Sequence, residues 1–579
     1  LPWGIKYNAN LGYVKVDHYS KDFKHAMYTY NPKTLERKNF SAYVSAKDWD
    51  NNAINYTFYN TLSWGKSFGG NHNFNVMVGT EYKRYDGKNF QAKKRDYFNN
   101  QLTALSVGAT MEDISGGSSL ELLFSYFGRI TYDYKEKYLI DVTARYDGSS
   151  NFAANNKWGF FPSVALKWNA AKENFLKDVR WIDELSLRLS AGRTGNDAIS
   201  AYRSLAAMSS TTSGYLFDGM QPGAYYRSRL ASPNLTWEKT DLYNAALDLA
   251  FFNNRLMITA EGYISKTRDL LLTVQTASAT GYTSRYANIG KTSNKGVELS
   301  IESRNIVRPK FSWTTNLTIA HNKQNVDDIG SEDFVTALSS PGNNPYMMYG
   351  YVKGYPLNSL WGFKYGGTWK SAEEREENAV TKTYVSPANT DGGPRYYDTN
   401  HDGVLSREDL IYQGNADPYL YGGLQNTFYI HGFKLGVYFA YSLGGKIYNY
   451  SELYMAGSSM SNQYRYMLDA WHPVRNPQSN LPRAGAVDAH VPSDLMIYDA
   501  SYIRLKNITV GYTFDLSKRS KFIRDITLNL SAENLHIWKK YNGFDPDVST
   551  DSSDSALRRV DLGAYPKPRT IVFSIQLRY

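Results

Sequence analysis

Alternation of apolar and polar residues over long segments is the feature that most constrains how this chain can fold. In the last nine residues, Ile571, Phe573 and Ile575 occupy every second position. Ser574 and Gln576 occupy the positions between them. A period of two places the two groups on opposite faces of an extended strand. The pattern predicts a β-strand with one apolar and one polar environment at its faces.

The same alternation recurs along the whole chain. It predicts about sixteen strands, near residues 3–17, 51–66, 72–86, 119–134, 137–148, 157–170, 181–193, 236–252, 254–270, 287–304, 309–325, 418–430, 432–446, 499–515, 522–540 and 568–579. Many of these segments reach roughly 14 residues, more than the five or six usual in soluble sheets and enough to cross a membrane at a tilt. Their length therefore indicates membrane-spanning strands.

Compact links alternate with long polar connections between the predicted strands. The compact links lie around 66–71, 135–136, 253–254, 306–310, 431 and 517–521. The long connections, rich in Gly, Ser, Asn and Asp, cover 87–118, 194–235, 326–417, 447–498 and 541–567. Outer-membrane barrels have short periplasmic turns and long external loops, whereas a soluble β-sandwich has no reason to gather every long loop at one end. The chain is predicted to be all-β, a transmembrane antiparallel β-barrel with both ends periplasmic.

Two helical segments are expected within this framework. The inner link 171–180 is longer than the others, and a helical turn is expected there. Residues 451–471 are expected to form a helix in an outer loop, with Leu453, Met455, Met460 and Met467 as packing residues.

Composition narrows the class of protein. Mean hydropathy is -0.51, and the sequence has no apolar run of about 18 residues, which argues against a helical membrane protein. A transmembrane barrel needs apolar residues only on its lipid-facing side, so its average hydropathy stays low. The 49 tyrosines suit the rims of a bilayer and the stacking walls of a binding cavity, because the ring is apolar and the hydroxyl is polar.

Neither a nucleic-acid partner nor an enzyme is expected. The net charge is +10, but no basic run reaches five residues, so the charge is interpreted as solvated loops and lumen walls. The nine histidines form neither an HExxH nor an HxH pattern. No Ser, His and carboxylate can be grouped into a catalytic set. No organic cofactor is expected, and the absence of Cys excludes disulfides and thiol chemistry.

One loop has the spacing of a calcium-binding loop. Asp398, Asn400 and Asp402 place side-chain oxygens at positions 1, 3 and 5, and a glycine follows. The Val404 carbonyl stands at position 7 and Asp409 at position 12, where EF-hands usually carry Glu. A Ca²⁺ ion that stabilises the 398–409 loop is one interpretation. An Asp/Asn/Gly-rich turn without an ion is the other.

Two further groups of loop residues carry side chains that can bind ligands. An acidic group before the last strand lacks regular ligand spacing and is interpreted as a solvated loop: Asp545, Asp547, Asp551 and Asp554. An aromatic group is consistent either with sugar stacking or lid contact, or with loop packing: Tyr225, Tyr226, Tyr346, Tyr349, Tyr351, Tyr396, Tyr397, Tyr419, Tyr421, Tyr464 and Tyr466. No individual substrate contact is assigned.

Several stretches together resemble one known family. They are YLIDVTARYDGSSNF at 138–152, FFPSVALKWNAAKENFL at 160–176, LSAGRTGND at 189–197, LTWEKT at 235–240, NIGKTSNKGVELSIES at 288–303, GFKYGGTW at 362–369, DTNHDGVLSREDLIYQGNADPYLYGGL at 398–424, AWHPVRNPQSNLPRA at 470–484 and IVFSIQLRY at 571–579. With these motifs the sequence resembles the SusC/RagA family of TonB-dependent, or TonB-linked, outer-membrane transporters of Bacteroidetes.

The resemblance implies a 22-stranded barrel, an N-terminal plug and a TonB-binding segment. With about sixteen strands and no plug-like segment, residues 1–579 are interpreted as the C-terminal barrel portion, whose first strand would lie upstream. The implied function is active import of a large nutrient, either a glycan, which is favoured, or an oligopeptide, together with a SusD-like surface lipoprotein and TonB.

The resemblance also implies contact with outer-membrane lipid and lipopolysaccharide, and dimers of transporter–lipoprotein pairs. Sixteen is also a legitimate strand number for a porin, so a passive diffusion channel is the alternative.

Overall fold

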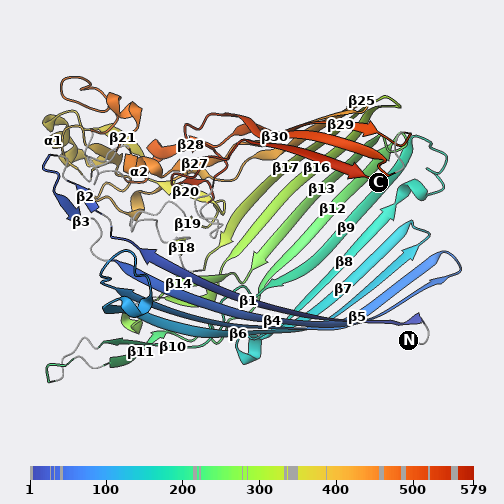
Figure 1. The fold of residues 1–579 in the computed structure, drawn as a ribbon, viewed down its shortest axis with the longest axis horizontal. Helices are drawn as coiled ribbons and strands as arrows, with labels where there is room; N and C mark the ends of the chain where they lie inside the picture. The colour runs from blue at the N-terminus through green and yellow to red at the C-terminus, as the bar shows by residue number, and fades with distance from the viewer. Residues whose placement is uncertain are drawn as a thin grey trace. The chain divides into compact units, whose positions relative to one another are not determined.

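A computed structural model shows sixteen strands joined by hydrogen bonds into one antiparallel sheet (Figure 1). In sheet order they are β1 (Lys6–Lys24), β4 (Ser45–Phe68), β5 (His72–Arg95), β6 (Thr110–Tyr134), β7 (Tyr138–Ser149), β8 (Trp158–Asn169), β9 (Ile182–Asn196), β12 (Glu238–Phe251), β13 (Leu256–Arg268), β16 (Lys291–Arg308), β17 (Phe311–Asp328), β25 (Leu420–Ile430), β26 (Phe433–Leu443), β29 (Tyr502–Asp515), β30 (Asp525–Lys539) and β32 (Thr570–Arg578).

The structure describes residues 4–26, 28–30, 33–39, 44–212, 218–220, 223–276, 278–282, 284–330, 335–336, 350–386, 388–455, 462–483, 491–518, 522–548 and 558–579. They form two compact units. Unit 1 comprises 1–166, 191–241 and 269–288, and unit 2 comprises 167–190, 242–268 and 289–579.

Each of the sixteen predicted strands corresponds to one strand of this sheet, so the strand prediction is confirmed. Its boundaries are wrong for β1, β4, β5 and β6, which are longer than predicted. The predicted loop 87–118 shrinks to 96–109, because β5 and β6 stay paired beyond their alternating parts. Polar cross-strand contacts accompany this extension, including Gln91 to Asp113 at 2.6 Å and Lys93 to Glu112 at 2.8 Å. Strands with polar residues on both faces give no period-two signal.

The two faces of the sheet differ in unit 1 as the alternation predicts. Val142 of β7 lies opposite Ile130 of β6, and these residues are 42% and 51% exposed. On the other face Asp141 accepts hydrogen bonds from Arg129 Nε at 2.8 Å and Thr131 Oγ1 at 3.1 Å. An apolar face left open on strand after strand suits a lipid environment, whereas the hydrogen-bonded polar face suits water.

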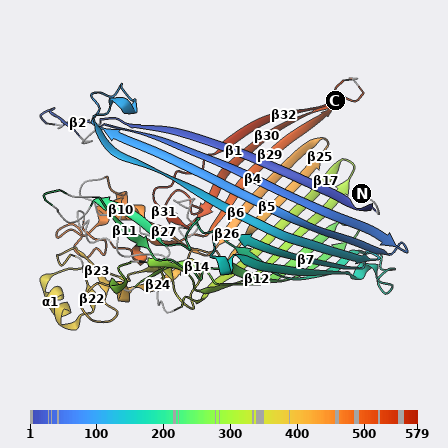
Figure 2. The same ribbon diagram turned by 90° about the horizontal axis from the view of Figure 1, so that it is seen from below.

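Short turns and long connections alternate in both units, as predicted. Lys135 and Glu136, between β6 and β7, have φ of 56° and 53°, the left-handed geometry common in tight hairpin links. In unit 2 the long connections lie at the end of the strands away from the C-terminus (Figure 1). In unit 1, β2, β10 and β11 lie at the end away from the N-terminus (Figure 2).

The long connections contain secondary structure of their own. In unit 1 this comprises β2 (Tyr28–Tyr30), β3 (Arg37–Asn39), β10 (Ala207–Thr212), β11 (Gly223–Arg229), β14 (Leu271–Gln275) and β15 (Ser284–Asn288). In unit 2 it comprises β18 (Val335–Thr336), β19 (Gly350–Tyr351), β20 (Ser359–Gly362), β21 (Tyr365–Thr368), α1 (Ala372–Thr381), β22 (Tyr384–Val385), β23 (Pro394–Tyr397), β24 (Ile411–Asn415), β27 (Lys446–Asn449), α2 (Ser451–Met455), β28 (Ile497–Asp499) and β31 (Val560–Asp561).

The helical predictions are confirmed in part. A 3-10 turn at Ala170–Lys172 lies at the start of the inner link. In place of the single helix expected over 451–471, the structure has α2 and a separate 3-10 turn at Arg465–Asp469. Met467 is buried, and Met460 lies outside the described residues. Among the described residues, no helix has the length and apolar character needed to cross a membrane.

The connections of unit 2 also have a hydrophobic core. Leu360, Tyr448, Met496 and Val560 are each at most 1% exposed and pack together. They come from β20, β27, the turn before β28, and β31. Burial of apolar side chains from four separate segments makes this region a folded assembly rather than a set of independent loops.

Candidate functional site

The polar face of unit 2 carries paired charges. Arg188 of β9 donates two hydrogen bonds to Asp248 of β12, at 2.6 and 3.0 Å. Thr259 of β13 donates to the same carboxylate at 3.1 Å. A fork of two parallel bonds between guanidinium and carboxylate is strong and directional. These charges therefore hold one another in place on a water-facing wall.

A pocket of about 500 Å³ opens on this face of unit 2. One wall comes from strands β13 to β29 and includes Glu298, Tyr421 and Tyr438. The connection before β32 supplies Asp547 and Arg559. Tyrosine rings beside charges of both signs can stack on a polar ligand and hydrogen-bond its edges. The pocket is the strongest candidate for substrate contact among the described residues.

Arg559 fixes the connection to the sheet at this pocket. Its guanidinium is buried and donates to the Gly444 carbonyl oxygen at 3.1 Å and to Ser442 Oγ at 2.8 Å. Burial lowers the pKa of Arg559, and the neighbouring Arg558 adds repulsion. Arg558 in turn pairs with Asp417 at 3.1 Å. The two arginines thus join the last long connection to β26 and to the segment before β25.

The acidic connection before β32 is more than a solvated loop, which corrects the sequence interpretation. Asp545 is 3% exposed and pairs with Arg504 of β29 at 2.6 Å. Asp547 pairs with Lys567 at 2.7 Å, and this contact lowers the pKa of Asp547 although burial opposes the shift. The partners come from distant parts of the sequence, which is why spacing gave no signal. Asp551 and Asp554 lie outside the described residues.

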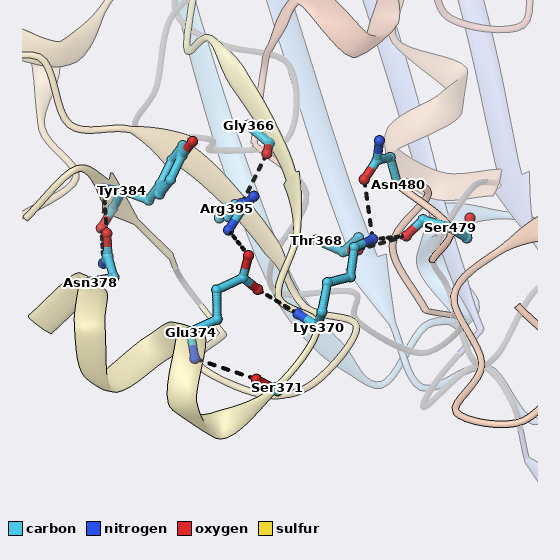
Figure 3. A network of polar contacts seen from close by, with 10 residues as sticks. All are labelled: Gly366, Thr368, Lys370, Ser371, Glu374, Asn378, Tyr384, Arg395, Ser479 and Asn480. Atoms are coloured by element: carbon cyan, nitrogen blue, oxygen red, sulfur yellow. Dashed lines mark hydrogen bonds and ion pairs between the residues drawn. The ribbon is translucent and has the colours of Figure 1, made fainter. Parts of the chain in front are cut away.

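Helix α1 is held to its neighbouring strands by Glu374 (Figure 3). The Ser371 side chain accepts from the backbone of Glu374 at 3.4 Å and caps the helix. The Glu374 carboxylate accepts from the backbone of Lys370 at 2.8 Å and from Arg395 Nη1 at 2.6 Å. Arg395 Nε donates to the Gly366 carbonyl oxygen at 2.9 Å. The network fixes β23 relative to the start of α1.

Lys370 connects the same network to a second segment (Figure 3). Its ammonium group donates to Thr368 Oγ1 at 2.7 Å, to Asn480 Oδ1 at 3.1 Å and to the Ser479 carbonyl oxygen. These oxygens are neutral, so Lys370 acts as a bridge between β21 and residues 479–480 rather than as a paired charge.

The predicted calcium loop follows β23 directly. The backbone N–H of Asp398 donates to the Thr383 carbonyl oxygen at 3.1 Å, which fixes the start of the loop. Its Oδ2 accepts from the Gly403 N–H at 2.7 Å. Asp398 is 2% exposed, and its Oδ1 is buried without a hydrogen-bond partner in the structure. Gly403 has φ of 84°, a conformation that favours glycine.

The structure brings the other predicted ligand residues into the same turn. Asn400 Oδ1 accepts from the Asp402 N–H at 3.1 Å, and Asp402 Oδ1 accepts from the Val404 N–H at 2.7 Å. Asp409 is fully buried and accepts from the N–H groups of Thr399 and Ser406, at 2.8 and 2.9 Å. Among the described residues, no three Asp, Glu, His or Cys side chains form a group that could hold a metal ion.

The aromatic loop residues divide into three kinds. Tyr396 is 1% exposed and belongs to the packed interior of the unit 2 connections. Tyr225 is exposed on β11, and Tyr421 lines the pocket. Tyr346 and Tyr349 lie outside the described residues. Arg504 and Arg559 could not be identified from the sequence, because no motif or spacing marks either residue.

Long antiparallel strands with an apolar and a charged face, joined alternately by short turns and long connections, are typical of transmembrane β-barrel proteins. Residues 1–449 match a family model described as TonB dependent receptor-like, beta-barrel. The chain therefore belongs to the TonB-dependent receptor barrel family, whose members are outer-membrane proteins.

Two curated relatives agree with this assignment and with the SusC/RagA resemblance. TonB-dependent receptor P3 of Formosa agariphila is 34% identical over 91% of this chain and 52% of its own length. TonB-dependent receptor SusC of Bacteroides thetaiotaomicron is 29% identical over 91% of this chain and 50% of its own length. The chain thus spans about half the length of these relatives.

Solved structures support the fold. The structure of the RagAB peptide transporter matches with a TM-score of 0.80 and 24% identity, covering 99% of this chain and 60% of that one. The RagAB peptide importer in its open-open state matches with a TM-score of 0.79.

Proposed function

We propose that the protein containing this barrel actively imports a large nutrient across the outer membrane, energised through TonB. The observation that carries the proposal is the match of residues 1–449 to the TonB-dependent receptor barrel. The charged face supports it, because paired Arg and Asp side chains suit the wall of a water-filled interior. In this account the C-terminus is periplasmic, and the long connections face outward, in contact with substrate and lipopolysaccharide.

A SusD-like surface lipoprotein is the proposed partner at the outer mouth. Similarity to SusC and to RagAB supports a lipoprotein-assisted mechanism. The outer connections of unit 2 form a packed assembly, which gives a partner a defined surface to dock on. Pairs of transporter and lipoprotein would then associate as dimers.

We favour a glycan as the substrate over an oligopeptide. The pocket of unit 2 offers tyrosine rings that can stack on sugar rings, with carboxylate and guanidinium groups that can bind hydroxyls. RagAB, a structural neighbour, is a peptide transporter, so oligopeptides are the competing substrate class.

Uptake of labelled oligosaccharides and oligopeptides by cells carrying the full-length transporter tests the substrate. Glycan import predicts uptake of at least one oligosaccharide and a drop of about tenfold in Tyr421→Ala, the effect of losing about 1.4 kcal/mol of binding. Leu435→Ala, on the apolar face of β26, is the matched control and should transport normally. Uptake of oligopeptides alone would assign the transporter to that class instead.

Passive diffusion through a self-closed pore is the alternative function, and sixteen strands are compatible with it. A steady conductance from residues 1–579 alone in planar bilayers would support the passive pore. Transport only by the full-length protein would support active import.

A further inference from the structure

Two carboxylates in the 398–409 loop are buried without a cationic partner. Asp398 and Asp409 are 2% and 0% exposed, and among the described residues their carboxylates accept from backbone N–H groups and not from a cationic side chain. Removal of an ionised carboxylate from water is very unfavourable unless the charge is paired or bound to a metal. Asp409 is compensated by hydrogen bonds from the backbone of Thr399 and Ser406. Only one of the two carboxylate oxygens of Asp398 accepts a hydrogen bond.

The carboxylate oxygen of Asp398 that accepts no hydrogen bond is Oδ1. The Gly403 N–H binds the other oxygen at 2.7 Å and so turns this carboxylate toward the loop. Oδ1 is inaccessible to water and has no hydrogen-bond partner. Asn400 and Asp402 place further oxygens in the same turn, each also accepting from the backbone N–H two residues on. Because oxygens have two lone pairs, these atoms can accept a hydrogen bond and still bind a cation.

Two nearby cationic side chains contact carbonyl oxygens and not Asp398. Lys382 Nζ contacts the Asp402 carbonyl oxygen at 3.2 Å, not a carboxylate. His401 directs Nδ1 at the Lys382 carbonyl oxygen at 2.9 Å. Neither Lys382 nor His401 therefore pairs with the carboxylate of Asp398.

We propose that the 398–409 loop binds one calcium ion, with Asp398 Oδ1 as a direct ligand. Asn400, Asp402 and the Val404 carbonyl supply further oxygens, and water completes the shell. Calcium fits because it takes six to eight oxygen ligands in flexible geometry, including carbonyls and water. Magnesium requires near-ideal octahedral geometry, which a turn with one free carboxylate oxygen does not offer. The ion stabilises the connection between β23 and β24 and is independent of the proposed substrate.

Calcium titration of the chelator-treated full-length protein in detergent tests this site. Wild type should bind calcium at this site with a dissociation constant of about 10⁻⁴ to 10⁻³ M, the range of extracellular calcium modules. Asp398→Asn keeps an oxygen for the Gly403 N–H but lacks the negative charge, so its affinity at this site should fall at least about tenfold. Glu377→Ala, an exposed position on α1, is the control and should bind as wild type does.

Hydrogen exchange of the wild-type protein provides a readout that needs no variant. Calcium should slow exchange in residues 398–409, and magnesium at the same concentration should not. Equal calcium affinity of wild type and Asp398→Asn at this site would overturn the proposal. Unchanged exchange across residues 398–409 in saturating calcium would also overturn it.

Discussion

Arg504 of β29 and Asp545 of the connection before β32 lie 2.6 Å apart, and their side chains are only 6% and 4% exposed. Forty residues separate them, so the contact ties the last long connection to the wall of the sheet. Removal of one partner from a buried pair leaves an uncompensated charge, which costs far more than loss of an exposed pair.

Asp545→Asn should therefore destabilise the docked connection by about 3–5 kcal/mol. Hydrogen exchange in residues 540–548 should accelerate, while exchange in β29 changes little. Asp17→Asn is the control, because Lys15 and Asp17 form an exposed pair whose loss should be nearly neutral. Unaltered exchange in residues 540–548 of Asp545→Asn would show that the pair does not anchor the connection.

The stability of helix α2 depends on pH through Glu452. It is 4% exposed and accepts hydrogen bonds from Tyr498 at 2.8 Å and Asn449 at 3.0 Å. Burial raises the pKa of Glu452 from 4.5 to about 7, although both hydrogen bonds oppose the shift. The pKa of Glu452 is higher in the folded protein than in the unfolded chain. The free energy of unfolding of α2 is therefore highest below about pH 4.5 and falls as pH rises to about 7. The loss amounts to about 3 kcal/mol at most.

Hydrogen exchange of residues 446–455, corrected for intrinsic rates, measures this effect. Protection in wild type should fall between pH 5 and pH 8. Glu452→Gln, which cannot ionise, should keep its protection over the same range. A pH dependence of the same size in Glu452→Gln would assign the effect to another group.

Gly422 of β25 permits close strand pairing. A Cβ at this position would lie 2.0 Å from the Thr318 carbonyl oxygen of β17. Gly422→Ala should therefore disrupt the β17–β25 pair and reduce the folded fraction, measured by heat-modifiable migration in gels. At Gly436 of β26 the nearest atom would be 3.9 Å away, so Gly436→Ala should fold normally. Equal folded fractions in both variants would contradict the steric account.

The sheet could be predicted from sequence because the apolar and polar faces of each strand repeat with a period of two. The extensions of β5 and β6 could not, because Gln91 and Lys93 make polar contacts in a part without alternation. The Asp398 turn could be predicted from local spacing. The burial of Asp545 could not, because its partner Arg504 is distant in the sequence and only the fold brings them together.

Dependence of uptake on TonB distinguishes active import from passive diffusion. The measurement is uptake of the identified substrate by cells that carry the full-length transporter, with and without TonB. Active import predicts that uptake falls to the level of cells lacking the transporter when TonB is deleted. Undiminished uptake in the absence of TonB would contradict the account.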